Sequence, residues 1–186
     1  MGFLSDVNDH IAESSNAMFR VDRESVLWIV KMLIEAKARG VFVWLAGNGG
    51  SASTASHFAN DLRKQCLIKA ISIPDLGPTI SAYGNDEGWS EMYAGVVAGY
   101  AGPRDLVVLF SCSGDSENVV KTAQSPYGGL IVFTGNNRES RLVREGKSEV
   151  VVFVDHPDIM VQESVHLILC HAIVAALKKG AQDVGT

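Results

Sequence analysis

Two short turns rich in glycine and serine hold the residues whose types and spacing best suggest chemistry. The first is GNGGS, residues 47–51, and the second is SCSGDS, residues 111–116. Glycines let backbone N–H groups approach an anion, a helix N-terminus adds partial positive charge, and serine hydroxyls donate hydrogen bonds without bringing a charge. The two turns therefore indicate a binding site for a phosphate monoester.

Neither turn matches a common nucleotide-binding motif. No Lys-Ser or Lys-Thr follows the glycines, as a Walker A motif requires, and GNGGSA lacks the GxGxxG spacing of a dinucleotide site. The alternative interpretation is that Ser51 and Ser116 are N-caps and that the glycines only make tight turns. Two such turns at one edge of a sheet favour the phosphate site.

The elements that must position these turns alternate along the chain. Five apolar, β-branched runs predict strands at 41–46, 69–74, 105–110, 129–134 and 149–154. Helical periodicity or capping residues predict helices at 4–20, 23–39, 52–64, 88–100, 115–124, 137–145 and 158–180. This order predicts an α/β fold, a three-layer α-β-α sandwich around a five-stranded parallel sheet of the flavodoxin-like kind, with an N-terminal helical pair. Ligands of such sheets bind beyond the carboxyl ends of the strands.

Composition limits the class of protein. With 186 residues and 47% hydrophobic content, we expect one domain over 1–186, comprising helices in 1–40 and an α/β core in 41–180. A net charge of -5 without a long basic cluster argues against nucleic-acid binding. Three cysteines without CxxC spacing fit a reducing compartment, so we expect a cytoplasmic protein. The start of the chain lacks the pattern of a signal peptide, and no run of roughly 20 apolar residues predicts a membrane span.

Four motifs, in order and at similar spacing, resemble the sugar isomerase (SIS) domain of bacterial phosphoheptose isomerases. They are GNGGSASTASHFANDL, AYGNDEGW, SCSGDSENVVKTA and DIMVQESVHLILCH. The resemblance spans roughly residues 40–175, and the two preceding helices also fit the family. Glycine-serine turns specify the SIS fold, whereas the histidine-bearing helices indicate the phosphoheptose isomerase branch.

The resemblance implies a role for each matching position. The sugar phosphate is expected at the two turns and near three further residues, namely Asn48, Gly49, Gly50, Ser51, Ser111, Cys112, Ser113, Ser116, Asp86, Asp158 and Glu163. The family's catalytic positions match Asp61 and His171, and its zinc-binding positions match His57, Asp61, Glu163 and His171. A Zn²⁺ cofactor and a homotetramer with sites shared between subunits are implied as well.

Three positions depart from the family pattern. Cys112 replaces a more common Thr, Asp61 stands where the best-known members have Glu, and Glu163 stands where they have Gln. The shorter Asp61 reduces the reach of the expected base, and Glu163 adds a charge that suits a divalent cation.

The spacing of the expected catalytic residues raises a question of geometry. His57 and Asp61 are four residues apart and share one helix face. Glu163 and His171 are eight apart, about 12 Å along a helix, so both cannot easily contact one atom. Either Glu163 lies on a distorted first turn, or a second subunit completes the cleft. For His57 and Asp61 the plainer alternative is a surface pair, and His166 is expected to be a bystander.

Two functions remain open. The first is an aldose-ketose isomerase of a phosphorylated sugar, most simply sedoheptulose 7-phosphate, which needs a base for the proton beside the carbonyl and an acid for the carbonyl oxygen. The second is a non-catalytic SIS module that binds a phosphosugar or a protein partner such as a replication initiator. A binding module has no need for His57, Asp61 and His171 together, so their joint presence favours the enzyme.

Overall fold

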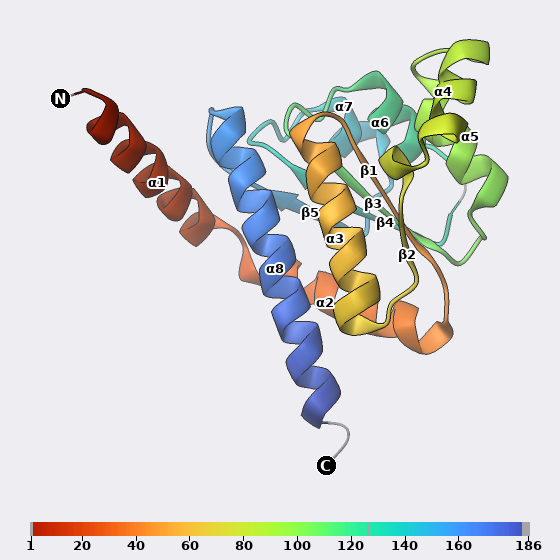
Figure 1. The fold of residues 1–186 in the computed structure, drawn as a ribbon, viewed down its shortest axis with the longest axis horizontal. Coiled ribbons are helices and arrows are strands. Elements are labelled where there is room, and N and C mark those ends of the chain that lie inside the picture. Colours follow the sequence, from red (N-terminus) through yellow and green to blue (C-terminus); the bar gives the residue numbers. More distant parts are fainter. Residues whose placement is uncertain (1, 126, 184–186) are drawn as a thin grey trace.

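The computed structural model of the protein describes residues 2–125 and 127–183, and Figure 1 shows a parallel sheet with helices on both faces. The strands are β1 (Val43–Gly47), β2 (Ala70–Ser72), β3 (Leu106–Ser111), β4 (Gly129–Thr134) and β5 (Val150–Phe153). They pair in the order β2-β1-β3-β4-β5, all parallel. The helices are α1 (Gly2–Arg20), α2 (Arg23–Arg39), α3 (Gly50–Cys66), α4 (Gly77–Asp86), α5 (Glu91–Tyr100), α6 (Glu117–Ala123), α7 (Arg141–Glu145) and α8 (Ile159–Asp183). The predicted α/β fold is confirmed.

Alternate side chains of the strands fill two separate apolar layers. In β1, Leu45 belongs to the layer under α2, α3 and α8, whereas Trp44 belongs to the layer under α5, α6 and α7. In β3, Phe110 belongs to the same layer as Leu45, and Leu109 belongs to the same layer as Trp44. Because both faces of the sheet are covered, the strands read as continuous apolar runs in the sequence.

A buried carboxylate fixes the amino ends of the two central strands. Asp105, only 7% exposed, accepts hydrogen bonds from the backbone N–H of Phe42 at 2.9 Å and of Gly102 at 2.8 Å. The indole Nε1 of Trp44 donates to the same carboxylate at 3.1 Å. A carboxylate with three donors is well satisfied inside a protein, so Asp105 joins β3 to the start of β1.

Several element boundaries differ from the predictions. β2 covers three residues rather than 69–74, because a 3-10 helix with Pro74 near its start begins at Ile73. Helix α4 was not predicted, since Gly77 and Pro78 look like a break in the sequence, yet proline is well tolerated in the first turn of a helix. α7 has five residues instead of nine. α6 ends at Ala123, one residue before its predicted end. Proline cannot continue a helix, so the sequence predicts that Pro126 stops this one, and Pro126 lies outside the described residues.

The sequence analysis predicted no apolar run of membrane-spanning length, and this prediction was wrong for the last helix. The stretch Ile159–Gly180 of α8 is long and apolar enough, with a mean hydropathy of 1.6 over its most apolar window. The helix packs against α1, α2 and α3, and Val161, Val165 and Leu169 lie in the core. Core helices of globular domains can be equally long and apolar. The contacts of α8 with α1, α2 and α3 are those of such a core helix.

Helix α1 extends away from the α/β core in Figure 1, with α8 as its main neighbour. At its C-terminal end the Arg20 guanidinium donates to the backbone carbonyl of Asp155 at 2.9 Å. Its first half presents apolar side chains to solvent, namely Phe3, Leu4, Val7 and Ile11, each more than half exposed. An apolar stripe on a projecting helix is typical of a surface that another protein covers.

Candidate active site

The two glycine-serine turns meet where the strand order reverses. β1 and β3 are neighbours in the sheet, and Gly47, the last residue of β1, pairs with Phe110 just before Ser111. The first turn leads into α3 and the second into α6. Chain direction thus places both turns and both helix N-termini at one switch point of the sheet, which is the usual ligand position in this fold.

The backbone of the first turn requires its glycines. Gly49 has φ 55° and ψ -125°, a conformation that residues with a Cβ atom rarely adopt. At Gly47 a Cβ atom would lie 2.9 Å from the Phe110 carbonyl oxygen and from the Ser51 backbone. The bare backbone therefore lets α3 begin directly against the end of β3.

The hydroxyl groups of the turns remain free to donate. The N-cap of α3 is Gly49 rather than Ser51, and Ser116 caps α6 without a side-chain hydrogen bond to the helix. The Oγ atoms of Ser111 and Ser113 accept from the N–H groups of Gly114 and Asp115, both at 3.2 Å, which leaves their hydrogens available. The capping alternative is therefore confirmed by position for Ser116, whose hydroxyl makes no capping hydrogen bond, and contradicted for Ser51, which lies inside α3.

A cavity of about 150 Å³ opens between the turns. Its lining residues are Asn48, Ser51, Phe110, Ser111, Cys112, Ser113, Ser116, Ile159 and Glu163. Burial raises the pKa of the Cys112 thiol to about 11, and the neighbouring Glu163 carboxylate adds to the shift. The thiol is therefore neutral at ordinary pH and adds no negative charge. We call this cavity the serine cradle.

A reciprocal amide pair joins the first turn to the start of α6. Asn48 Nδ2 donates to Asn118 Oδ1 at 2.8 Å, and Asn118 Nδ2 donates to Asn48 Oδ1 at 2.9 Å. The Tyr93 hydroxyl, on α5, lies 2.8 Å from the Gly47 carbonyl and 3.1 Å from Asn48 Oδ1. Asn118 is fully buried. The sequence did not predict the roles of Asn118 and of the Tyr93 hydroxyl. Asn48 lies 70 positions from Asn118 and 45 from Tyr93, and contacts between residues so far apart leave no local signal.

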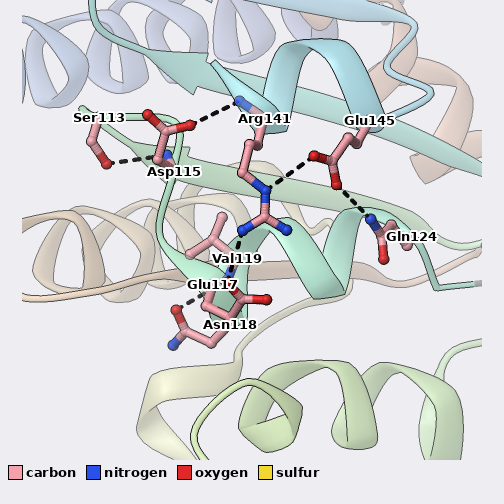
Figure 2. Close-up of polar contacts among 8 residues, drawn as sticks. All are labelled: Ser113, Asp115, Glu117, Asn118, Val119, Gln124, Arg141 and Glu145. Carbon is pink, nitrogen blue, oxygen red and sulfur yellow. Dashed lines mark hydrogen bonds and ion pairs between the residues drawn. The ribbon is translucent and has the colours of Figure 1, made fainter.

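The outer side of the second turn is tied to α7, as Figure 2 shows. The Arg141 backbone N–H donates to Asp115 Oδ1 at 2.9 Å, and its guanidinium binds Glu117 at 2.8 Å and Glu145 at 3.0 Å. The pairing with Glu117 lowers the pKa of that carboxyl group. These exposed pairs are individually weak, but together they hold the turn between the starts of α6 and α7.

Two histidines and an aspartate from α3 and α8 form a separate cluster. The Nε2 atoms of His57 and His171 lie 2.9 Å apart. Asp61 Oδ2 lies 3.3 Å from His57 Nε2 and 3.9 Å from His171 Nε2. Both histidine side chains are 51% exposed, and Asp61 is 17% exposed. The cluster therefore lies on the outer surface of the helix pair.

The donor set of this cluster fits a divalent metal ion. Its three ligand atoms lie within 4.8 Å of one another, at separations of 2.9, 3.3 and 3.9 Å. Tetrahedral zinc with bonds of about 2.0–2.1 Å requires neighbouring ligand atoms about 3.3 Å apart. Two imidazoles and one carboxylate are also a usual zinc ligand set that leaves a fourth position open.

The remaining predicted residues lie elsewhere. The structure places Glu163 in the lining of the serine cradle, on the second turn of α8, rather than within the histidine cluster. Asp158 accepts a hydrogen bond from the Met160 N–H at 2.7 Å at the start of α8. Asp86 is exposed at the end of α4, where the Asn85 amide donates to it at 2.7 Å. Neither aspartate lines the serine cradle.

Comparison with known proteins agrees with these features. The family model of the SIS domain matches residues 8–126. The phosphoheptose isomerase of Methylibium petroleiphilum is 28% identical over 99% of this chain and 100% of its own length, and that of Shewanella loihica is 27% identical over 81% and 80%. The solved structure of a phosphoheptose isomerase from Neisseria gonorrhoeae superposes with a TM-score of 0.87 at 24% identity, covering 95% of this chain and 98% of that one. The chain therefore belongs to the SIS-domain family, and the resemblance to phosphoheptose isomerases that its motifs indicated is confirmed.

Proposed function

We propose that the protein is an aldose-ketose isomerase of a phosphorylated sugar, with sedoheptulose 7-phosphate as substrate and a manno-heptose 7-phosphate as product. The observation that carries this proposal is that α3 and α8, which hold the cluster of imidazole and carboxylate groups, also contribute Ser51 and Glu163 to the serine cradle for the phosphate. The relatives' name, phosphoheptose isomerase, supports the class of substrate.

In this proposal the serine cradle holds the phosphate end of the sugar. Hydroxyl groups of Ser51, Ser111, Ser113 and Ser116 donate to the phosphate oxygens, and the N-terminus of α3 contributes its partial positive charge. Asn48, held by Asn118, presents its side chain to the same cavity. Binding the phosphate at a fixed point orients the carbonyl end for the reaction.

The reacting end needs one base and one acid. Asp61 removes the proton from the carbon beside the carbonyl and His171 protonates the carbonyl oxygen, which gives an enediol. Asp61 then returns its proton to the former carbonyl carbon while His171 takes the proton of the other enediol hydroxyl, which gives the isomeric sugar. His57, 2.9 Å from His171, holds the acid in position. The same three residues, His57, Asp61 and His171, would hold a divalent ion such as Zn²⁺, which would polarise the carbonyl group when bound; Asp61 and His171 would then act as ligands rather than as a free base and acid.

A second copy of the chain is needed to enclose this reaction. The histidines are half exposed, and the groove beside Asp61 and His171 is distinct from the serine cradle. His57 lies seven residues beyond Gly50 on α3, about 10 Å along the helix axis. We therefore infer a homo-oligomer, a tetramer as the resemblance implies, in which a neighbouring subunit closes the cleft; the exposed apolar stripe of α1 supports such contacts. A cytoplasmic location suits a phosphorylated substrate.

A coupled assay on sedoheptulose 7-phosphate tests the catalytic part. With and without added zinc, we expect His171→Ala and Asp61→Ala each to lose about 100-fold or more in kcat, because acid-base groups contribute roughly 10²–10⁴. Asn60→Ala, an exposed neighbour on α3, serves as control and should keep wild-type activity. Equal turnover by all variants, or none by wild type, would favour a binding module instead.

Calorimetry with the same sugar phosphate tests the cradle. Ser51→Ala combined with Ser113→Ala should weaken binding at least about tenfold, since hydrogen bonds to charged groups contribute roughly 1.5–3 kcal/mol each. Ser81→Ala, whose hydroxyl bonds the Pro78 carbonyl far from the turns, is the control. Unchanged affinity of the double variant would remove the cradle assignment.

A further inference from the structure

The serine cradle contains a negative charge where a phosphate is expected to bind. Glu163 reaches it from α8, and a Cβ atom added to Gly50 would collide with the Glu163 carboxylate. The carboxylate therefore rests against the first turn of α3. That turn is where the helix presents its partial positive charge, so Glu163 occupies part of the position that favours an anion.

Among the described residues that line the serine cradle there is neither lysine nor arginine to compensate this charge. Within residues 2–125 and 127–183, no hydrogen bond or ion pair is made to the Glu163 carboxylate, although the residue is partly buried. A partly buried carboxylate without donors is costly, and it favours a ligand that brings donors of its own.

We propose that Glu163 determines which phosphates enter the cradle, excluding bare phosphate ions and admitting phosphate on a polyhydroxylated chain. This inference rests on the cradle proposed above. An inorganic phosphate brings roughly one to two negative charges and only one or two P–OH donors, fewer than the hydroxyl groups of a sugar phosphate, so its repulsion from Glu163 is compensated less. A sugar phosphate brings hydroxyl groups that donate to the carboxylate, and hydrogen bonds to a charged acceptor are the stronger kind.

Such selectivity matters for an enzyme of this class. A cradle built from helix N-termini and hydroxyls binds any small oxyanion. A cradle that also binds inorganic phosphate tightly is inhibited by it. A single carboxylate beside the anion removes that competition, and it leaves the neutral donors of Ser51, Ser111 and Ser113 in place for the substrate.

The test compares two ligands in wild type and in Glu163→Gln, which keeps the shape and removes the charge. In a chelator-containing buffer, calorimetry measures the Kd of inorganic phosphate and of sedoheptulose 7-phosphate. Even at the dielectric constant of water, one charge about 5 Å from a phosphate dianion corresponds to roughly a tenfold change in Kd. We expect Glu163→Gln to bind inorganic phosphate at least about tenfold more tightly, and the ratio of the two Kd values to shrink.

Two controls locate the effect. Glu24→Gln on α2 changes the net charge equally, lies far from the cradle, and should leave both affinities unchanged. Adding Ser111→Ala and Ser113→Ala to Glu163→Gln should abolish the gain. If the gain survives these serine changes, or if both ligands gain equally, the selectivity proposal is overturned.

The outcomes separate this inference from the proposed function. Unchanged phosphate affinity in Glu163→Gln, together with sugar phosphate binding that needs the serines, would overturn the role of Glu163 and leave the cradle standing. Absence of sugar phosphate binding in wild type and Glu163→Gln alike would overturn both.

Discussion

The Nε2 atoms of His57 and His171 face each other at 2.9 Å across the junction of α3 and α8, although 114 positions separate the two residues in the sequence. Their rings meet edge to face, with centroids 4.9 Å apart. At this distance at most one nitrogen carries the shared proton, or both lone pairs point to one cation. The two rings therefore either share one hydrogen bond or form part of a metal site.

Metal binding should depend on this pair. After removal of divalent ions with a chelator, we expect wild type to bind about one zinc per chain in equilibrium dialysis. His57→Ala and His171→Ala should each lose most of the affinity, because two remaining ligands hold zinc poorly. His10→Ala on α1 controls for the loss of a histidine. Equal zinc content in all four proteins would contradict the site.

The buried amide pair predicts a joint effect on stability and binding. Asn118→Ala removes both hydrogen bonds of the amide pair, leaves Asn48 with the Tyr93 hydroxyl alone, and should lower the free energy of unfolding by roughly 1–3 kcal/mol. It should also weaken sugar phosphate binding, since Asn48 is then free to turn. Urea unfolding and calorimetry measure the two effects. Asn60→Ala, exposed on α3, should change neither; an Asn118→Ala protein with full affinity would show that Asn48 needs no support.

Loss of the Asp105 carboxylate should destabilise the sheet. Asp105→Ala leaves the N–H groups of Phe42 and Gly102 and the Trp44 indole without an acceptor. We expect a loss of roughly 3–5 kcal/mol in the free energy of unfolding, because each buried donor left without an acceptor costs roughly 1–3 kcal/mol. Urea unfolding followed by tryptophan fluorescence reports it. Asp155→Ala, at an exposed position, is the comparison, and similar midpoints for both variants would refute the effect.

Acid should destabilise the protein through His166. Burial lowers the pKa of this imidazole from 6.5 to about 4 in the folded chain. Above pH 6.5 neither state binds the proton, so the contribution is complete; as the pH falls toward 4 the unfolded state binds it and the folded state does not, so stability falls. Across that window the loss is about 3 kcal/mol.

Unfolding curves at several pH values check this slope. His166→Leu should show a shallower decrease in stability between pH 6.5 and 4, whatever its stability at neutral pH. His10→Gln, which removes a histidine from α1, should keep the wild-type slope. Parallel curves for wild type and His166→Leu would contradict the assignment.

Local sequence patterns were sufficient to predict most of the fold. Each glycine-serine turn follows an apolar run and precedes a helical one, so its place at the carboxyl edge of the sheet follows from chain direction alone. Trp44 stands inside an apolar run and Cys170 among apolar residues of the last predicted helix, which predicts packing for both, and both are buried. For Trp89 and Tyr93 the sequence is compatible with either the core or a wall of the cavity; Trp89 is 60% exposed, whereas Tyr93 is buried.

Long-range relationships could not be predicted in the same way. The direction of Glu163 depends on how α8 lies over α3, and helix packing angles leave no trace in a single sequence. The contact of Asn48 with Asn118 likewise needs the spacing of β1 and β3. Helix α4 was missed because Gly77 and Pro78 suppress a helical interpretation locally, while its contacts with α5 stabilise it.

Because helix α1 projects with exposed apolar side chains, the thermal stability of the protein should depend on its concentration. Phe3, Leu4, Val7 and Ile11 gain nothing from the folding of their own chain, so what they contribute comes from whatever covers them. If that cover is another copy, the melting temperature rises with each tenfold increase in concentration, and a chain shortened before residue 12 melts at one temperature whatever its dilution.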